Sequence, residues 1–325
     1  MINTNPIGLF DSGIGGTSIW KAINQLMPNE NTIYLADSKN APYGVKSKEE
    51  IIALSKKNTE LLLENNCKII VVACNTATTN AIKELRATYD VPFIGIEPDI
   101  KPAATHSKTQ TIGILATKGT LSSELFNQTV SLYQETNIIE QIGYGLVELI
   151  ENGEINSTKM EELLVSYLKP MIEKNIDYLV LGCSHYPYLI PKIKEILPKS
   201  IQIIDSGEAV AKQTLAVLQN QTGISDLKKG KCEFYSNVNP KVLDDILENK
   251  YKIFQTYDNL LDGLIKLGKI RLIKKAHDTE KIVKSKTSND GVYIIDKTGS
   301  IIQHFSKKEG LQQTNVLSVF CDQQQ

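Results

Sequence analysis

Hydrophobic and polar positions form alternating blocks along most of this chain. Short, wholly apolar runs at 69–73 and 178–182 are typical of strands that are buried on both faces of a parallel sheet. Between such runs, apolar residues recur every three or four positions, which predicts amphipathic helices at 47–66, 80–89, 122–135, 157–175, 188–197 and 208–219. Because strands and helices alternate, we expect an α/β fold with parallel sheets.

The pattern occurs twice in the same order. Segment 6–17 is echoed by 111–120, the two apolar runs follow, and 91–98 is echoed by 201–207. The spacing is constant, since both 183 − 74 and 203 − 94 give 109. Solenoid repeats are shorter, at about 20 to 50 residues, so this spacing predicts a duplicated domain. We expect two similar doubly wound parallel-sheet domains related by pseudo-symmetry.

The repeat also predicts the domain boundaries. Residues 1–98 together with 207–260 should form the first α/β domain, and 99–206 the second. Residues 261–325 are a C-terminal extension of unknown role, in which two apolar runs flank Asp-Lys-Thr-Gly at 291–305 and predict a hairpin. We interpret the extension as a packing or oligomer-contact element, with a regulatory or partner-binding role as the alternative.

Composition narrows the class of protein. The 36 basic and 37 acidic residues give a net charge of −1, so no general attraction to nucleic acid or to a membrane surface is expected. No stretch approaches the roughly 18 apolar residues that span a bilayer, and the first residues lack a secretion signal, which favours the cytoplasm. Five cysteines, an odd number, indicate reduced thiols. We expect Cys67, Cys232 and Cys321 to be chemically inert.

The remaining two cysteines end the two apolar runs at equivalent positions. Cys74 is followed by Asn75-Thr76 and Cys183 by Ser184-His185. The carboxyl ends of parallel strands open into the ligand crevice, and a helix starting there would lower a thiol pKa and bind carboxylates. If the crevices face each other, one thiol lies on each side of a bound molecule. That arrangement can remove a proton from one face of a carbon and deliver another to the opposite face.

Two loops are further candidates. Asp11-Ser12-Gly13 follows an apolar strand, and its glycine allows close backbone approach, but the spacing matches neither nucleotide-binding pattern. An amine or a proton-transfer partner suits Asp11 better, with a helix cap as the alternative. Ala41-Pro42-Tyr43-Gly44 is a turn that either presents N–H groups to a carboxylate or is an ordinary surface turn.

His185, two residues after Cys183, could protonate or hydrogen-bond a neighbouring group near neutral pH. A Cys-x-His pair also raises the possibility of a metal site, although the chain has no compact Cys/His cluster with zinc-site spacing. A Cys-His-Asn hydrolase is another alternative, but it explains only one of the two thiols.

Together these motifs resemble the glutamate racemases, within the wider family of cofactor-independent aspartate/glutamate racemases. The resemblance covers about residues 6–258 and rests on the segments at 8–13, 42–44, 73–77, 95–98, 182–187 and 205–207. It implies two α/β domains with the active site between them and glutamate as the substrate. It further implies no pyridoxal phosphate, metal or other cofactor, a homodimer, and D-glutamate supplied for peptidoglycan.

The resemblance also implies roles for single residues. Cys74 would remove the α-proton of D-glutamate and Cys183 that of L-glutamate, assisted by Asp11 and His185 respectively, with Glu151 orienting the histidine. The implied substrate-binding residues are Asp11, Ser12, Pro42, Tyr43, Gly44, Asn75, Thr76, Thr117, Thr120, Ser184 and His185. Two alternatives stay open: a racemase of another amino acid such as aspartate, and a non-catalytic carboxylate-binding or interaction module.

Overall fold

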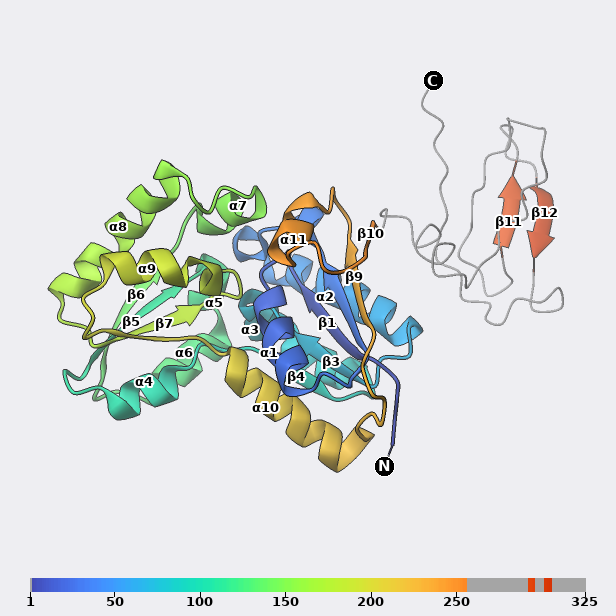
Figure 1. The fold of residues 1–325 in the computed structure, drawn as a ribbon, viewed down its shortest axis with the longest axis horizontal. Helices are drawn as coiled ribbons and strands as arrows, with labels where there is room; N and C mark the ends of the chain where they lie inside the picture. Colours follow the sequence, from blue (N-terminus) through green and yellow to red (C-terminus); the bar gives the residue numbers. More distant parts are fainter. Residues whose placement is uncertain (1, 256–291, 296–300, 306–325) are drawn as a thin grey trace, which may run out of the picture. The chain divides into compact units, whose positions relative to one another are not determined.

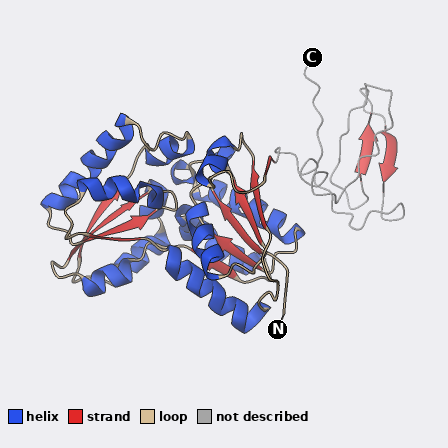
Figure 2. Ribbon diagram, viewed as in Figure 1, coloured by secondary structure: helices blue, strands red, loops and turns tan. Residues whose placement is uncertain are grey.

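The computed structural model describes residues 2–255, 292–295 and 301–305. The chain divides into two units, Met1–Gln255 and Thr256–Gln325. The first unit contains two parallel sheets, each with helices on both faces (Figures 1 and 2). The predicted α/β class with two doubly wound parallel sheets is therefore confirmed.

The first sheet has six strands in the order β10-β9-β2-β1-β3-β4, all paired in parallel. Their bounds are β1 Ile7–Asp11, β2 Thr32–Ala36, β3 Ile69–Val72, β4 Phe93–Gly95, β9 Cys232–Ser236 and β10 Ile253–Gln255. Helix α1 (Thr17–Leu26) packs against α10 (Gly207–Val217), and α2 (Lys48–Glu64) against α3 (Asn75–Thr88). Because β9 pairs with β2, the chain returns to the first sheet after completing the second.

The second sheet has four parallel strands in the order β6-β5-β7-β8. Its elements are β5 Thr111–Ala116, β6 Asn137–Ile142, β7 Tyr178–Gly182, β8 Gln202–Ile204, α4 Ile100–His106, α5 Lys118–Leu121, α6 Glu124–Val130, α7 Leu146–Glu151, α8 Thr158–Glu173 and α9 Ile190–Ile196. This strand order repeats the β2-β1-β3-β4 part of the first sheet, with β7 in the place of β3. The cysteine-bearing strands are thus topologically equivalent.

Caps explain where several helices begin. Ser47 and Glu50 form a capping box at the start of α2. Helix α3 begins at Asn75 rather than at residue 80, because the Cys74 sulfur accepts the Ala77 N–H and caps it. The predicted helix 122–135 is wrong in extent, since the structure has only α6 there.

The apolar strands form the expected core. All residues of β1 and β3 are buried, including the Asp11 side chain at the end of β1. Trp20 of α1 packs edge-on against Phe234 of β9, with ring centroids 4.7 Å apart. This contact packs β9, the strand that returns to the first sheet, against α1, the helix that follows the Asp11 loop.

In the second unit the structure describes β11 (Val292–Ile295) and β12 (Ile301–Phe305), which pair antiparallel and confirm the predicted hairpin. Cys321 and the rest of the extension lie outside the described residues. Cys74, Cys183 and Cys232 are free thiols. Within the described ranges, no helix is both long enough and apolar enough to cross a membrane.

Candidate active site

The ends of β3 and β7 meet at one small cavity. Cys74 and Cys183 both line it, and their exposed fractions are 4% and 5%. The cavity volume is about 10 Å³, close to that of a single water molecule. The two strand-end crevices therefore face each other, which is the condition for one thiol to lie on each side of a bound molecule.

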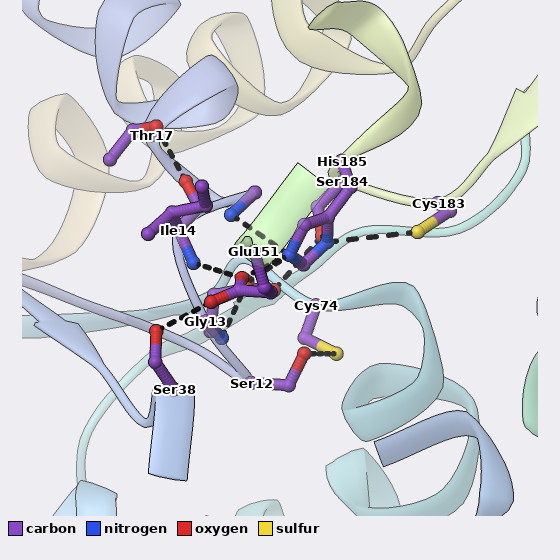
Figure 3. Close-up of polar contacts among 12 residues, drawn as sticks. Ser12, Gly13, Ile14, Thr17, Ser38, Cys74, Glu151, Cys183, Ser184 and His185 are labelled. Atoms are coloured by element: carbon purple, nitrogen blue, oxygen red, sulfur yellow. Dashed lines mark hydrogen bonds and ion pairs between the residues drawn. The ribbon is translucent and has the colours of Figure 1, made fainter. Parts of the chain in front are cut away.

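Cys74 lies at the amino end of α3. Its sulfur accepts the Ala77 N–H at 3.4 Å. It also lies 3.7 Å from the Ser12 hydroxyl oxygen (Figure 3). Burial raises the pKa of the Cys74 thiol well above its usual value, the charge of Asp11 raises it further, and the Ala77 N–H opposes both only in part. Cys74 is consequently held as the neutral thiol.

Cys183 has a different environment. No helix begins directly after it: a turn leads into the 3₁₀ helix η3 (Tyr186–Leu189), and only then does α9 begin. A helix amino end therefore does not supply its polar partner. Instead, Nδ1 of His185 lies 3.8 Å from the Cys183 sulfur (Figure 3).

His185 is held in one orientation by Glu151. Its Nε2 lies 2.6 Å from Oε1 of Glu151, and a carboxylate can only accept, so Nε2 carries a proton and Nδ1 faces Cys183. Burial alone would lower the pKa of His185, but its bonds to Cys183 and Glu151 raise it well above the usual value. In the part of the chain that the structure describes, no three His, Cys, Asp or Glu residues are grouped so as to hold a metal ion.

Glu151 is the last residue of α7, in the half of the unit that contains the second sheet. Both of its carboxylate oxygens nevertheless accept hydrogen bonds from residues of the half that contains the first sheet. Oε1 accepts the Ile14 N–H at 2.7 Å, and Oε2 accepts the Ser38 hydroxyl at 2.7 Å (Figure 3). Burial raises the pKa of Glu151, but the bonds from His185, Ile14 and Ser38 outweigh it and hold the pKa below its usual value. The carboxylate is thus charged.

Asp11 is fully buried at the end of β1. Its Oδ2 accepts the Gly13 N–H and its Oδ1 the Ser184 hydroxyl, both at 2.9 Å. Burial raises the pKa of Asp11, while His185, with Nε2 4.0 Å away, lowers it. Asp11 therefore forms a hydrogen bond with Ser184, next to Cys183, and it affects Cys74 only through its charge, which raises the pKa of that thiol.

Most of the residues predicted to bind substrate line the same cavity. They are Ser12, Pro42, Tyr43, Gly44, Asn75, Thr76, Thr117, Ser184 and His185. Thr120 lies behind the lining, where its hydroxyl contacts those of Thr117 and Thr76 at 3.1 and 3.4 Å. Asn75 is 2% exposed, and neither polar atom of its side chain has a hydrogen-bond partner among the residues that the structure describes, so both can bind a ligand.

The family model for Asp/Glu/hydantoin racemase matches residues 7–214. The chain belongs to this family. A curated glutamate racemase of Herpetosiphon aurantiacus is 44% identical over 214 residues, which cover 66% of this chain and 84% of that protein. The resemblance to glutamate racemases found in the sequence is confirmed.

Solved structures agree with this membership. A glutamate racemase of Bacillus anthracis superposes on this racemase-family chain with a TM-score of 0.71 and 29% identity, over 79% of this chain and 98% of the other. The glutamate racemase of Escherichia coli, in complex with L-glutamate and the activator UDP-MurNAc-Ala, gives a TM-score of 0.69 and 30% identity over 77% and 97%.

Three residues of this racemase site were missed by the sequence interpretation. Val147 lines the cavity. Asp37 accepts the Tyr43 hydroxyl at 2.5 Å and so anchors the 42–44 loop, and Ser38 bonds to Glu151. Asp37 and Ser38 directly follow β2, so the strand-end rule that pointed to Cys74 would have found both.

Proposed function

We propose that this chain interconverts L- and D-glutamate, with Cys74 and Cys183 as the two acid/base groups. The observation that carries the proposal is that both thiols line one cavity, each at the end of an equivalent strand of a duplicated fold. The curated relatives named glutamate racemase support the choice of substrate. A single-thiol hydrolase would leave the second cysteine unexplained.

The chemistry requires more than a base. An amino acid α-proton is far less acidic than a thiol with a pKa of about 8.5, and each unit of mismatch costs about 1.36 kcal/mol. The site must therefore stabilise the developing carbanion with donors in a water-poor cleft. Asn75 is the first residue of α3, and its side-chain amide has no partner among the described residues, so it is suited to binding the α-carboxylate together with the Thr76 hydroxyl. The Ser184 hydroxyl can join them by turning from Asp11 to the substrate.

The two thiols are supported differently. In the proposed L-to-D reaction, Cys183 as thiolate removes the α-proton beside the His185–Glu151 pair, and the Cys74 thiol protonates the opposite face. The D-to-L reaction reverses these roles. The raised pKa of Cys74 favours a resting enzyme in which Cys74 keeps its proton.

The mechanism also requires movement. The cavity is about the size of one water molecule, and glutamate is much larger, so the two halves must separate to admit it. The remaining predicted binding residues would then close around the bound substrate: Ser12, Pro42, Tyr43, Gly44, Thr117 and Thr120. Closure expels water, which strengthens each interaction with the carbanion.

In the cell, this activity would supply D-glutamate for peptidoglycan from the cytoplasm, with a homodimer as the expected assembly. No pyridoxal phosphate or metal has a step in the mechanism, because the thiols move the proton and the polar lining stabilises the charge. Dialysis against a chelator should leave the activity unchanged, in a preparation that shows no pyridoxal phosphate absorbance.

The decisive experiment is incubation with L-glutamate in deuterium oxide. Racemisation should place deuterium at the α-carbon, and C74A and C183A should each lower the rate below about one-thousandth of wild type, as expected for loss of an acid/base group. C232A is the matched control, since Cys232 is a free thiol of β9 that does not line the cavity. Label in aspartate but not in glutamate would reject the substrate assignment, and no label with either would reject the racemase.

A further inference from the structure

The link between the two halves at Glu151 has a consequence for the reaction. Glu151 and His185 belong to the second sheet's half, whereas Ile14 and Ser38 belong to the first. The Ser38 hydroxyl is the only side-chain donor from the first half that the described residues place on the Glu151 carboxylate. The orientation of His185 therefore depends on a contact that crosses the cleft.

Ser38 is itself firmly placed in the first half. It begins the 3₁₀ helix Ser38–Asn40 directly after Asp37. Asn237, which follows β9, accepts the Lys39 N–H at 2.9 Å and donates to Asp37 at 2.5 Å. The Asn40 side chain donates to Asp37 at 2.8 Å. Because the segment is bonded on both sides of Ser38, the hydroxyl has a defined position when the halves close.

We propose that Ser38 is a positioning residue that couples closure of the cleft to the proton chemistry of Cys183. With the halves together, Ser38 and the Ile14 N–H fix the Glu151 carboxylate, which fixes the His185 ring with Nδ1 toward the thiol. With the halves apart, Glu151 loses both donors. Glu151, His185 and Cys183 are then held in this arrangement only when the halves are closed around a bound substrate. Cys74, in contrast, takes its contacts from Ser12 and Ala77, which belong to its own half.

The proposal rests on the proposed racemisation and predicts an asymmetry between the thiols. The equilibrium constant between enantiomers is one, so S38A must change kcat/KM equally in both directions. We expect a fall of about 10-fold, the size of a lost hydrogen bond to a charged group. The asymmetry appears in the primary isotope effects: with α-deuterated L-glutamate the effect on kcat/KM rises, because proton removal by Cys183 becomes more rate-limiting, and with α-deuterated D-glutamate it falls.

Two further variants make the experiment specific. S38T keeps the hydroxyl and should retain near-wild-type isotope effects. S107A is the matched control, because Ser107 also donates to a carboxylate at 2.7 Å, that of Asp177, and neither residue lines the cavity. The proposal would be overturned if kcat/KM fell equally in S38A and S107A. It would also be overturned if the isotope effects in S38A changed alike for both enantiomers.

A readout independent of turnover separates this proposal from the racemase assignment. In histidine-labelled protein, the ¹⁵N spectrum of the His185 imidazole should change in S38A and stay unchanged in S107A. If wild-type protein fails to racemise glutamate, the proposed function fails, while the spectra still test whether Ser38 positions His185. An unchanged His185 spectrum in folded S38A would reject the positioning role.

Discussion

Oε1 of Glu151 lies 2.6 Å from Nε2 of His185, and the two residues are 34 positions apart in the chain. The bond fixes the ring so that Nδ1 faces Cys183, and it stabilises the charged imidazolium. The arrangement has the order carboxylate, imidazole, thiol, in which each group orients the next. Cys183 therefore has an imidazole and a carboxylate behind it, whereas the Cys74 sulfur contacts the Ser12 hydroxyl and the Ala77 N–H.

The first prediction concerns the charge of Glu151. E151Q keeps the shape of the side chain but removes the negative charge that stabilises the imidazolium. We expect kcat/KM to fall by about 100-fold, within the range for loss of acid/base assistance. Steady-state racemisation assayed from both enantiomers checks this. E154Q, one turn beyond the end of α7, is the control and should leave the rate unchanged.

The second prediction concerns pH. The pKa of His185 is raised in the folded protein, so protonation of His185 stabilises the fold. This stabilisation is fully present below the unfolded-state pKa of about 6.5, and it is lost as the pH rises through the higher pKa of the folded state. We expect the His185 signal in an NMR titration, assigned by its absence in H185Q, to titrate above 6.5. The same signal should titrate at lower pH in E151Q. Titration at or below 6.5 in wild type would contradict the assignment of Glu151 as its partner.

The sequence was sufficient for the two thiols because their signal is local. An apolar run predicts a buried strand, the residue after it lies at the ligand edge of the sheet, and the same pattern 109 residues later supplies the second copy. The α/β class and the duplicated sheets follow from the same periodicity. Neither inference needed any contact between distant segments.

The missed features depend on contacts that no local pattern contains. Glu151 was identified only through the family resemblance, since its donors Ile14 and Ser38 lie 137 and 113 positions away. The start of α3 was placed too late because a cysteine sulfur acts as the cap in place of the usual Ser, Thr, Asp or Asn. The partner of Cys183 also escaped the local pattern, because the equivalent strand ends have different surroundings: a helix begins after Cys74 but a turn follows Cys183.

The third prediction concerns closure of the cleft. A Cβ at Gly119 would lie 2.9 Å from Cγ2 of Thr76 and 3.1 Å from the backbone of Gly44, which has no flexible end to move aside. G119A should hold these segments apart and lower kcat/KM by about 100-fold, as expected when a closing element is misplaced by about 1 Å. Circular dichroism should be unchanged, because alanine favours the helix. K118A, at the exposed neighbouring position, should behave as wild type.

The fourth prediction concerns stability away from the site. Lys68 and Glu30 form a 2.7 Å ion pair with side chains only 2% and 4% exposed, and they also bind the Asn3 carbonyl and the Ser225 N–H. K68M should lower the free energy of unfolding by about 3–5 kcal/mol, because it leaves a buried carboxylate without its cation. K56M breaks the exposed Lys56–Glu84 pair and should cost about 1 kcal/mol or less. Urea unfolding measures both, and adding E30Q to K68M should recover part of the loss by removing the stranded charge. Equal costs for K68M and K56M would show that water reaches the Lys68–Glu30 pair in solution.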